Sequence, residues 1–143
     1  MDKISKEKRS WTMSRVKGKD TSPEKIVRSL LHRLGYRFRL HRKDLPGRPD
    51  VVLPKKRIAI FVHGCFWHRH EGCPRATTPR TNQDYWLQKF SRNVARDKKA
   101  FSDLTALGWS VIVVWECEMK NIPLLTERFS TLLKSSGRTA LDE

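Results

Sequence analysis

The sequence predicts an α/β protein in which helices flank a mixed central β-sheet, formed as a single domain over residues 21–143. Two long segments repeat apolar residues at helical spacing, and shorter segments between them alternate or are continuously apolar, as strands are. The elements follow one another as helix, three strands, long loop, helix, strand and helix. The chain of 143 residues is long enough for one domain with a substantial core and too short for two comfortable ones.

The first predicted helix begins at Thr21 and ends at Gly35. Thr21 is a favourable cap, Pro23 falls in the first turn, and Glu24 stands three residues after the cap, as in a capping box. Glycine is the residue that most often follows the end of a helix. The apolar face of this helix consists of Ile26, Val27, Leu30, Leu31 and Leu34.

Three short strands are predicted after this helix. Residues 36–40 alternate apolar and basic side chains, as a half-buried strand does, and residues 51–53 and 57–63 are largely apolar. Residues 45–49 form a turn rich in Pro and Gly. Residues 64–82 have no periodicity and are predicted to form a long loop, and such a loop inside a compact domain usually carries function.

A long helix is predicted from Asp84 to Leu107, followed by a buried strand over residues 109–115. A last helix is expected to begin at Ile122 and to end near Gly137. The stripe of the long helix that should face the sheet consists of Leu87, Phe90, Val94, Asp97, Phe101 and Leu104.

The composition is strongly basic, with 30 Lys and Arg against 15 Asp and Glu and a formal net charge of +15. A positive field of this size favours polyanions, because each neutralised phosphate releases condensed counterions. Ribosomal, membrane-surface and heparin-binding proteins share this bias, so charge alone indicates only a class of partner. The five Trp and six Phe favour a packed domain with a basic face, and residues 1–20 are expected to form a basic arm or a helix on DNA.

The sequence contains no apolar stretch of membrane-spanning length and no apolar signal region at its N-terminus, so no membrane partner and no export are expected. Three cysteines cannot all pair within the chain. A reducing cytoplasm, with cysteine serving as a metal ligand, is therefore expected.

A zinc site is predicted in the long loop. Cys65, His70 and Cys73 fall within nine residues of it, and Cys117 directly follows the strand over residues 109–115. Structural zinc takes four Cys or His ligands, so these residues would tie the loop to a distant strand end. The alternative is three buried cysteines and a surface histidine, although free Cys has little packing reason to lie in a loop. A zinc deaminase is set aside because its His-x-Glu and Pro-Cys-x-x-Cys signatures are absent.

A magnesium site is predicted at Asp50, which heads a short strand, while the neighbouring strand ends in Phe61-Val62-His63. Many metal nucleases place an Asp on one strand and an acid-x-Lys on the next, and here the second half is Phe-x-His. One carboxylate is acceptable for magnesium, which keeps several waters. The backbone carbonyl of Val62 could supply a further oxygen.

Two histidines flank the first zinc ligand, and His63 and His68 are both candidates for acid–base catalysis because imidazole titrates near neutral pH. Either could instead be a solvated or loop-packing histidine, but two of them in a metal loop favour catalysis. Asp97 stands where the helix stripe calls for an apolar residue, and a buried charge needs a partner. That partner is either a catalytic histidine or a neighbouring Lys or Arg.

Aromatic residues mark the same region. Phe66 and Trp67 lie in the loop, and Trp86 lies near the start of the long helix. Apolar wedges unstack DNA most cheaply where base pairing is already faulty, which offers a route to mismatch preference. Without further information the favoured interpretation is a small aromatic cluster packing around the zinc.

Several motifs in fixed order, spread from about Met13 to Cys117, resemble the very short patch repair endonucleases. The motifs are Leu45-Pro46-Gly47-Arg48-Pro49-Asp50, His63-Gly64-Cys65-Phe66-Trp67-His68, Asn93-Val94-Ala95-Arg96-Asp97, Leu107-Gly108-Trp109 and Trp115-Glu116-Cys117.

The resemblance implies a restriction-endonuclease-like fold that uses catalytic magnesium and a structural zinc. It implies a nick 5′ of the thymine in T·G mismatches left by deamination of 5-methylcytosine, with mismatch-repair proteins and a polymerase as partners. In the active site it implies that Asp50 binds magnesium, that His63 and His68 act around the scissile phosphate, and that Asp97 supports a histidine. It also implies that Glu24 lies near the active site.

The resemblance further assigns zinc to Cys65, His70, Cys73 and Cys117. It implies that an N-terminal helix embraces the minor groove. The DNA-binding residues expected on this basis are Phe66, Trp67 and Trp86 as wedges, Met13 on the opposite side of the intercalation, and Lys89 and Asn93.

The predicted activity is therefore hydrolysis of one phosphodiester by magnesium-activated water, with His68 or His63 as general base. A monomer with one active site would leave a nick, and the bacterial cytoplasm, at the nucleoid, is the expected location. Two alternatives remain: a restriction-type nuclease that dimerises and cuts both strands of matched DNA, and a non-catalytic, zinc-stapled DNA-binding protein. The strand carboxylate Asp50 with two nearby histidines argues against the second.

Overall fold

The computed structural model describes residues 21–135 of the chain. The basic arm expected over residues 1–20, with Met13 in it, and the expected helix end near Gly137 lie outside the described residues. The elements in chain order are α2 (Ser22–Arg33), β1 (Arg39–Leu40), β2 (Val51–Leu53), the 3-10 turn η1 (Pro54–Lys56), β3 (Ile58–His63), α3 (Gln83–Ala106), β4 (Ser110–Trp115), the 3-10 helix η2 (Glu116–Lys120) and α4 (Ile122–Ser135).

The four strands form one mixed sheet in the order β1-β2-β3-β4. The pairs β1–β2 and β2–β3 are antiparallel, and β3–β4 is parallel. A parallel pair needs a long crossover connection, which the loop and α3 together supply here. The predicted mixed α/β architecture is thereby confirmed.

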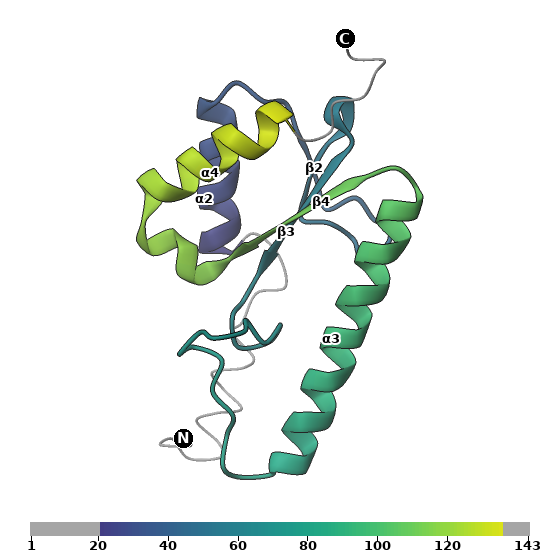
Figure 1. Ribbon diagram of the computed structural model, residues 1–143, viewed down its shortest axis with the longest axis vertical. Helices are drawn as coiled ribbons and strands as arrows, with labels where there is room; N and C mark the ends of the chain where they lie inside the picture. Colours follow the sequence, from purple (N-terminus) through teal and green to yellow (C-terminus); the bar gives the residue numbers. More distant parts are fainter. Residues whose placement is uncertain (1–20, 136–143) are drawn as a thin grey trace.

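Helices cover both faces of the sheet, with α2 and α4 on one face and α3 on the other (Figure 1). Side chains alternate along a strand, so Val52, Ala59 and Phe61 face α3 and pack with its Leu104. The larger core lies on the opposite face and consists of Val27, Leu30, Leu31, Val51, Leu53, Ile58, Ile60, Ile112, Val114, Leu125, Phe129 and Leu133.

The N-terminus of α2 has the predicted capping box. The Thr21 hydroxyl accepts from the Glu24 N–H at 3.4 Å, and the Glu24 carboxylate accepts from the Thr21 N–H at 2.8 Å. This reciprocal pair fixes the Glu24 side chain, which is only 3% exposed. The helix is followed by Gly35 at a φ of 87°, a conformation that glycine adopts without strain.

Three predicted features differ in the structure. The strand expected over residues 36–40 is limited to β1, because β2 offers ladder partners only to Arg39 and Leu40. The strand expected to be buried along its length, β4, is fully buried only at Ile112 and Val114, because it forms the edge of the sheet. Leu87, expected in the apolar stripe of α3, is 52% exposed, because the first half of α3 extends beyond the sheet (Figure 1).

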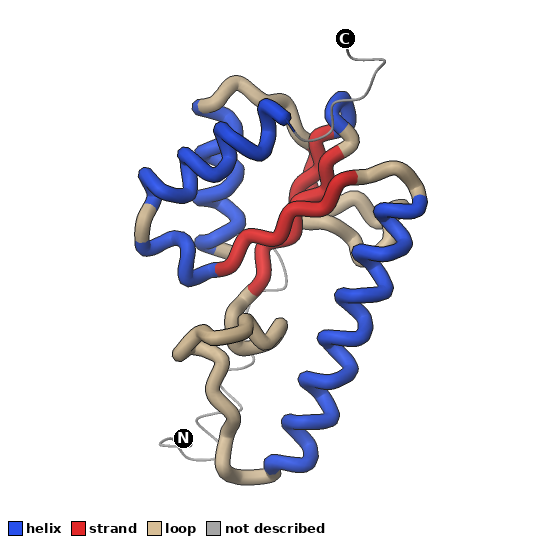
Figure 2. Tube along the Cα trace, in the orientation of Figure 1, coloured by secondary structure: helices blue, strands red, loops and turns tan. Residues whose placement is uncertain are grey.

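Residues 64–82 form the predicted long loop, which joins β3 to α3 without a helix or strand of its own (Figure 2). In the described part of the chain, no helix combines the length and the apolar character that crossing a bilayer requires.

Candidate active site and metal-binding loop

A cavity of about 570 Å³ lies where β3 ends and the loop begins. Because β2 runs antiparallel to β3, Asp50, just before β2, lies beside the end of β3 that carries His63. The cavity thereby brings together the acids and imidazoles that the sequence singled out, and these are Glu24, Asp50, His63, His68 and Asp97. Two arginines to which the sequence motifs gave no individual role, Arg48 and Arg96, also line it.

The Asp50 carboxylate is held by the backbone of β3, since the Val62 N–H donates to its Oδ2 at 2.7 Å. Burial raises the pKa of Asp50 to about 7, the Val62 N–H lowers it, and the nearby Glu24 raises it further. Within the described residues, the Oε1 atom of Glu24 is buried without a hydrogen-bond partner. Two desolvated carboxylates of this kind are suitable ligands for a hard cation.

His41 belongs to the same group and was not identified from the sequence. Ligand atoms of Glu24, His41 and Asp50 lie within 4.8 Å of one another. The His41 Nε2 atom lies 3.1 Å from the Arg28 guanidinium and 3.9 Å from the Glu24 carboxylate. No short-range pattern relates His41 to Glu24 and Asp50, because the three residues lie on different segments of the chain.

His63 and His68 stack face to face, with ring centroids 3.6 Å apart and an interplanar angle of 7°. The His68 Nδ1 atom lies 2.7 Å from Asp97 Oδ2, so the partner of Asp97 is a histidine and not a neighbouring Lys or Arg. With Nδ1–H donated to this carboxylate, the neutral His68 ring has its lone pair on Nε2. In the pair of His68 and Asp97, the atom that can accept a proton is therefore Nε2 of His68.

His63 is buried between the sheet and α3, and its ring is 5.3 Å from Trp115 and 5.9 Å from Phe101. Burial lowers the pKa of His63 to about 4; the adjacent His68 lowers it as well, and Asp97 raises it. At neutral pH His63 is therefore an uncharged ring beside the more exposed His68.

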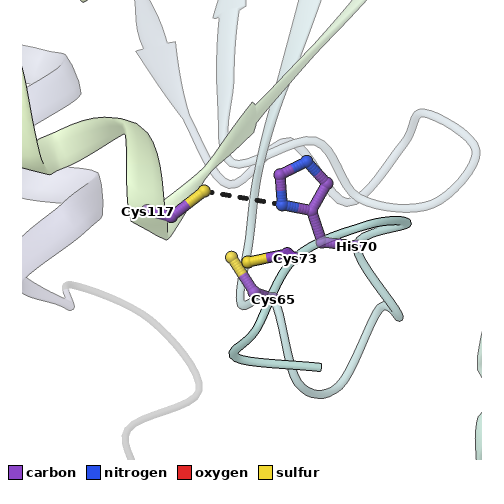
Figure 3. Close-up of side chains that lie close together, drawn as sticks. All are labelled: Cys65, His70, Cys73 and Cys117. Carbon is purple, nitrogen blue, oxygen red and sulfur yellow. Dashed lines mark hydrogen bonds between the residues drawn. The ribbon is translucent and has the colours of Figure 1, made fainter. Parts of the chain in front are cut away.

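The loop and η2 bring Cys65, His70, Cys73 and Cys117 together (Figure 3). One ligand atom from each lies within 4.8 Å of the others, and the Cys117 sulfur is 3.5 Å from His70 Nδ1. No cysteine is in a disulfide. Three sulfurs and one imidazole nitrogen, gathered from two distant segments, could hold a metal ion that prefers soft ligands.

The candidate metal-binding group, formed by Cys65, His70, Cys73 and Cys117, is attached to the end of β4 and the start of η2 by two further contacts. The His70 ring stacks on Trp115, with centroids 4.2 Å apart, and the Cys65 N–H donates to the Glu116 carboxylate at 3.1 Å. Glu116 also lines the cavity, so this residue, for which no individual role was predicted, joins the two sites.

Phe66, Trp67 and Trp86 pack together with Phe90 of α3, with ring centroids 5.1 to 5.8 Å apart. The aromatic cluster expected as one interpretation is therefore present, although it packs on α3 and the ring that stacks on the metal-binding group is Trp115.

Two polar residues of α3 contact this cluster at Trp67. The Lys89 ammonium lies 5.5 Å from the Trp67 ring, and the Asn93 amide donates to the Trp67 carbonyl at 3.3 Å. These residues and Phe66 and Trp67 are close to the cavity, which both aromatic residues help to line.

A mixed sheet that gathers carboxylates and imidazoles in one cavity, in a chain with a net charge of +15, defines a nuclease-type site. The family is specified by comparison with known proteins. Residues 1–75 match the model of the family described as DNA mismatch endonuclease Vsr. Together with its full-length relatives, this match shows that the chain belongs to the Vsr family of DNA mismatch endonucleases, which are hydrolases.

The relatives cover nearly the whole chain. The type II nicking enzyme V.XorIIP of Xanthomonas oryzae pv. oryzae is 51% identical over 135 residues, which are 94% of this chain and 98% of the relative. The DNA mismatch endonuclease Vsr of Escherichia coli is 43% identical over 123 residues, covering 86% of this chain and 78% of the relative. The type II nicking enzyme V.NmeAIP of Neisseria meningitidis is 42% identical, covering 89% of this chain and 90% of the relative.

Proposed function

We propose that this protein is a magnesium-dependent endonuclease that nicks one DNA strand 5′ of the thymine in a T·G mismatch, in the very short patch repair of deaminated 5-methylcytosine. The observation that carries the proposal is the single cavity lined by Asp50, His63 and His68. Family membership and the mismatch endonuclease and nicking enzymes among its relatives support the same activity.

Asp50 and the Val62 backbone carbonyl are the proposed protein ligands of the magnesium ion. When bound, the ion would polarise the scissile phosphate and lower the pKa of its coordinated water. The donor set fits, because a cation would compensate the two desolvated carboxylates of Asp50 and Glu24. Glu24 is proposed to orient the water on the metal side of the cavity.

His68 is the proposed general base. Asp97 accepts its Nδ1–H, so Nε2 takes a proton from the water whose oxygen attacks phosphorus. The bond from phosphorus to the leaving oxygen breaks, and that oxygen takes a proton from solvent. His63 is uncharged and buried against the His68 ring, which favours it as the residue that orients His68 over the role of base.

Zinc is the proposed metal at Cys65, His70, Cys73 and Cys117, because a closed set of three thiolates and one imidazole is typical of a structural zinc. The ion would replace the hydrophobic burial that the loop lacks.

Phe66, Trp67 and Trp86 are the proposed wedge in the duplex, with Met13 on the opposite side and Lys89 and Asn93 as further DNA-binding residues. Phe66 and Trp67 line the cavity, which supports the wedge role, because an inserted ring would place the disturbed base step next to the cleavage site. The T·G preference follows from the low cost of unstacking a mismatched pair.

The wider setting is also proposed. The α/β core over residues 21–143 is proposed to be a single restriction-endonuclease-like domain that acts as a monomer, with residues 1–20 as its DNA-binding arm. The expected partners are mismatch-repair proteins and a polymerase in the bacterial cytoplasm.

The deciding experiment incubates the protein with T·G and matched duplexes in varied flanking sequence, with and without magnesium. We expect a nick only in the thymine strand of T·G duplexes and only with magnesium. Double-strand cleavage of matched DNA would instead support a restriction-type enzyme, and binding without cleavage would support a DNA-binding protein.

Asp50→Asn is the matched variant for this experiment. We expect it to abolish nicking while binding T·G DNA about as tightly as the wild type, because the amide keeps the shape but is a poor magnesium ligand. Band-shift titration and nicking assays on the same preparations measure both properties. Persistent nicking by purified Asp50→Asn would contradict the assignment.

A further inference from the structure

Arg69 stands between a residue of the cavity and a residue of the metal-binding group, since its neighbours are His68 and His70. Its backbone is in the left-handed region, with a φ of 56°, which is unfavourable for a residue with a side chain. Such a conformation persists only where surrounding contacts enforce it, and it is frequent at functional sites. The contacts of the Arg69 side chain show what enforces this conformation.

The Arg69 guanidinium donates four hydrogen bonds to two separate parts of the loop. Nη1 donates to the carbonyls of Phe66 and Thr77 at 3.1 and 2.9 Å. Nη2 donates to the Ala76 carbonyl at 2.9 Å and the Thr78 hydroxyl at 3.2 Å. A single side chain thereby ties the backbone of an aromatic wedge residue to the far end of the same loop.

The guanidinium also joins the loop to α3. Its central carbon lies 3.9 Å from the centroid of the Phe90 ring and 5.7 Å from that of Phe66. Phe90 is buried, so the arginine is sandwiched against a fixed ring of the helix. The fork of four donated bonds, made while the group lies over the Phe90 ring, requires a guanidinium and is not reproduced by lysine.

The metal-binding group holds a different part of the loop. Its ligands in the loop span residues 65–73, whereas the acceptors of Arg69 include residues 76–78, beyond the last of these ligands. The Phe66 carbonyl is likewise held by Arg69 and by no metal ligand. Arg69 therefore holds Phe66, Thr77 and Thr78 directly, whereas the metal-binding group reaches this segment through the backbone bond from the Ala76 N–H to the Cys73 carbonyl.

We propose that Arg69 is a positioning residue for mismatch recognition, which holds Phe66 and Trp67 ready for insertion before DNA binds. The inference rests on the proposed function, because it specifies how the wedge is prepared. If the loop is ordered before DNA binds, binding does not have to supply the conformational entropy of ordering it. The effect of Arg69 should therefore appear in the distortion of the DNA and in kcat for nicking.

The test compares Arg69→Lys and Arg69→Ala with the wild type, with Arg80→Ala as matched control. Arg80 is an exposed arginine of the same loop. Three properties are measured: bound zinc per chain, fluorescence of 2-aminopurine placed beside a T·G pair, and kcat and KM for nicking.

We expect both Arg69 variants to retain zinc and thermal stability close to the wild type. Their 2-aminopurine signal on binding should fall strongly, and nicking should decrease by about 10²-fold, mainly in kcat, because the wedge is misplaced. Arg80→Ala should match the wild type in all three measurements.

Two outcomes would overturn the proposal. One is a wild-type fluorescence signal and kcat in Arg69→Lys, and the other is loss of zinc in both Arg69 variants, which would make the residue a structural part of the metal loop. Failure of the wild type itself to nick T·G duplexes would instead overturn the proposed function, so the two failures are distinguishable.

Discussion

Single residues define the chemistry of the cavity through their immediate neighbours. Asp97 lies on α3, 29 positions along the chain from His68, yet the two side chains meet at 2.7 Å. In the proposed mechanism the carboxylate holds the ring tautomer and would stabilise the imidazolium that forms when His68 accepts a proton. At this scale the charge at position 97 has a function that an apolar residue of the same helix stripe could not supply.

Replacing Asp97 by Asn tests this pairing. The amide keeps the size of the side chain but removes the charge, so we expect kcat for nicking to fall about 10²–10⁴-fold with little change in KM. Single-turnover nicking of a T·G duplex measures the effect. Lys98→Ala, at the neighbouring exposed position, is the control, and a wild-type kcat in Asp97→Asn would refute the proposed base.

The lowered pKa of His63 predicts that the stability of the fold depends on pH. Burial lowers its pKa from 6.5 to about 4 in the folded state, so the unfolded chain takes up a proton more readily than the folded one. The contribution of His63 to the free energy of unfolding is therefore fully present above pH 6.5. It is lost as the pH falls toward 4, and the loss is about 3 kcal/mol at most.

The measurement is urea unfolding of the wild type and His63→Gln across this pH range. The variant cannot titrate at position 63, so its stability should decline less steeply between pH 6.5 and 4. All other titrating groups are common to both proteins. Parallel pH profiles would show that His63 does not contribute.

At the scale of elements, the loop over residues 64–82 is held by side-chain contacts, within the loop through Arg69 and outside it through η2. It has no regular structure and is attached to η2 by Cys117 and Glu116, while η2 is itself fixed to α4 by the ion pair of Glu118 and Arg128 at 2.7 Å. A loop without its own ladder of hydrogen bonds depends on such attachments. The position of His68 in the cavity therefore depends on contacts formed far along the chain.

Loss of the metal should release this loop while leaving the helical core folded. Cys117→Ser removes one of the four ligands, so we expect zinc content and nicking to be lost together and proteolysis to cut within residues 64–82. Far-ultraviolet circular dichroism should change little, because α2, α4 and their core lie on the other face of the sheet. Full zinc retention by the variant would contradict the assigned ligand set.

Helix α3 serves two purposes along its length. Its second half covers the sheet with Leu104 and Ala100, whereas its first half extends past the sheet and carries Trp86 and Phe90, on which the loop packs. The exposed Leu87 follows from this arrangement, because no strand lies beneath that part of the helix.

For the whole molecule, the net charge of +15 dominates encounter with DNA. Neutralised phosphates release counterions, so affinity should fall steeply with salt. If about six to ten phosphates are contacted, we expect a loss of about 10³–10⁵ in affinity between about 50 and 200 mM salt.

This salt dependence is measured by titrating T·G and matched duplexes at several NaCl concentrations. Both affinities should decline with similar slopes, because phosphate contacts carry no sequence information, while their ratio changes little. A shallow slope for either duplex would show that the basic residues do not face the DNA.

Much of the fold follows from local sequence. Residues close together in the chain set four of its features. These are the capping box of Thr21 and Glu24, the limits of α3, the strand ending at His63 and the irregular loop over residues 64–82. The gathering of Cys65, His70, Cys73 and Cys117 was also predictable, because three of them share one loop and the third cysteine of the chain is the remaining candidate. Short-range spacing is sufficient where hydrogen bonding and ligand chemistry act over a few residues.

Other features were decided only when distant segments packed together. No local pattern relates the residues that meet in three of these contacts. They are His68 with Asp97, His41 beside Asp50, and Phe66 on α3. The sequence by itself determined which chemical groups are present and which elements carry them. The tertiary structure decided which groups meet, because that depends on the register of β3 against β4 and on how helices lie on the sheet, which are set by burial of side chains across the whole domain.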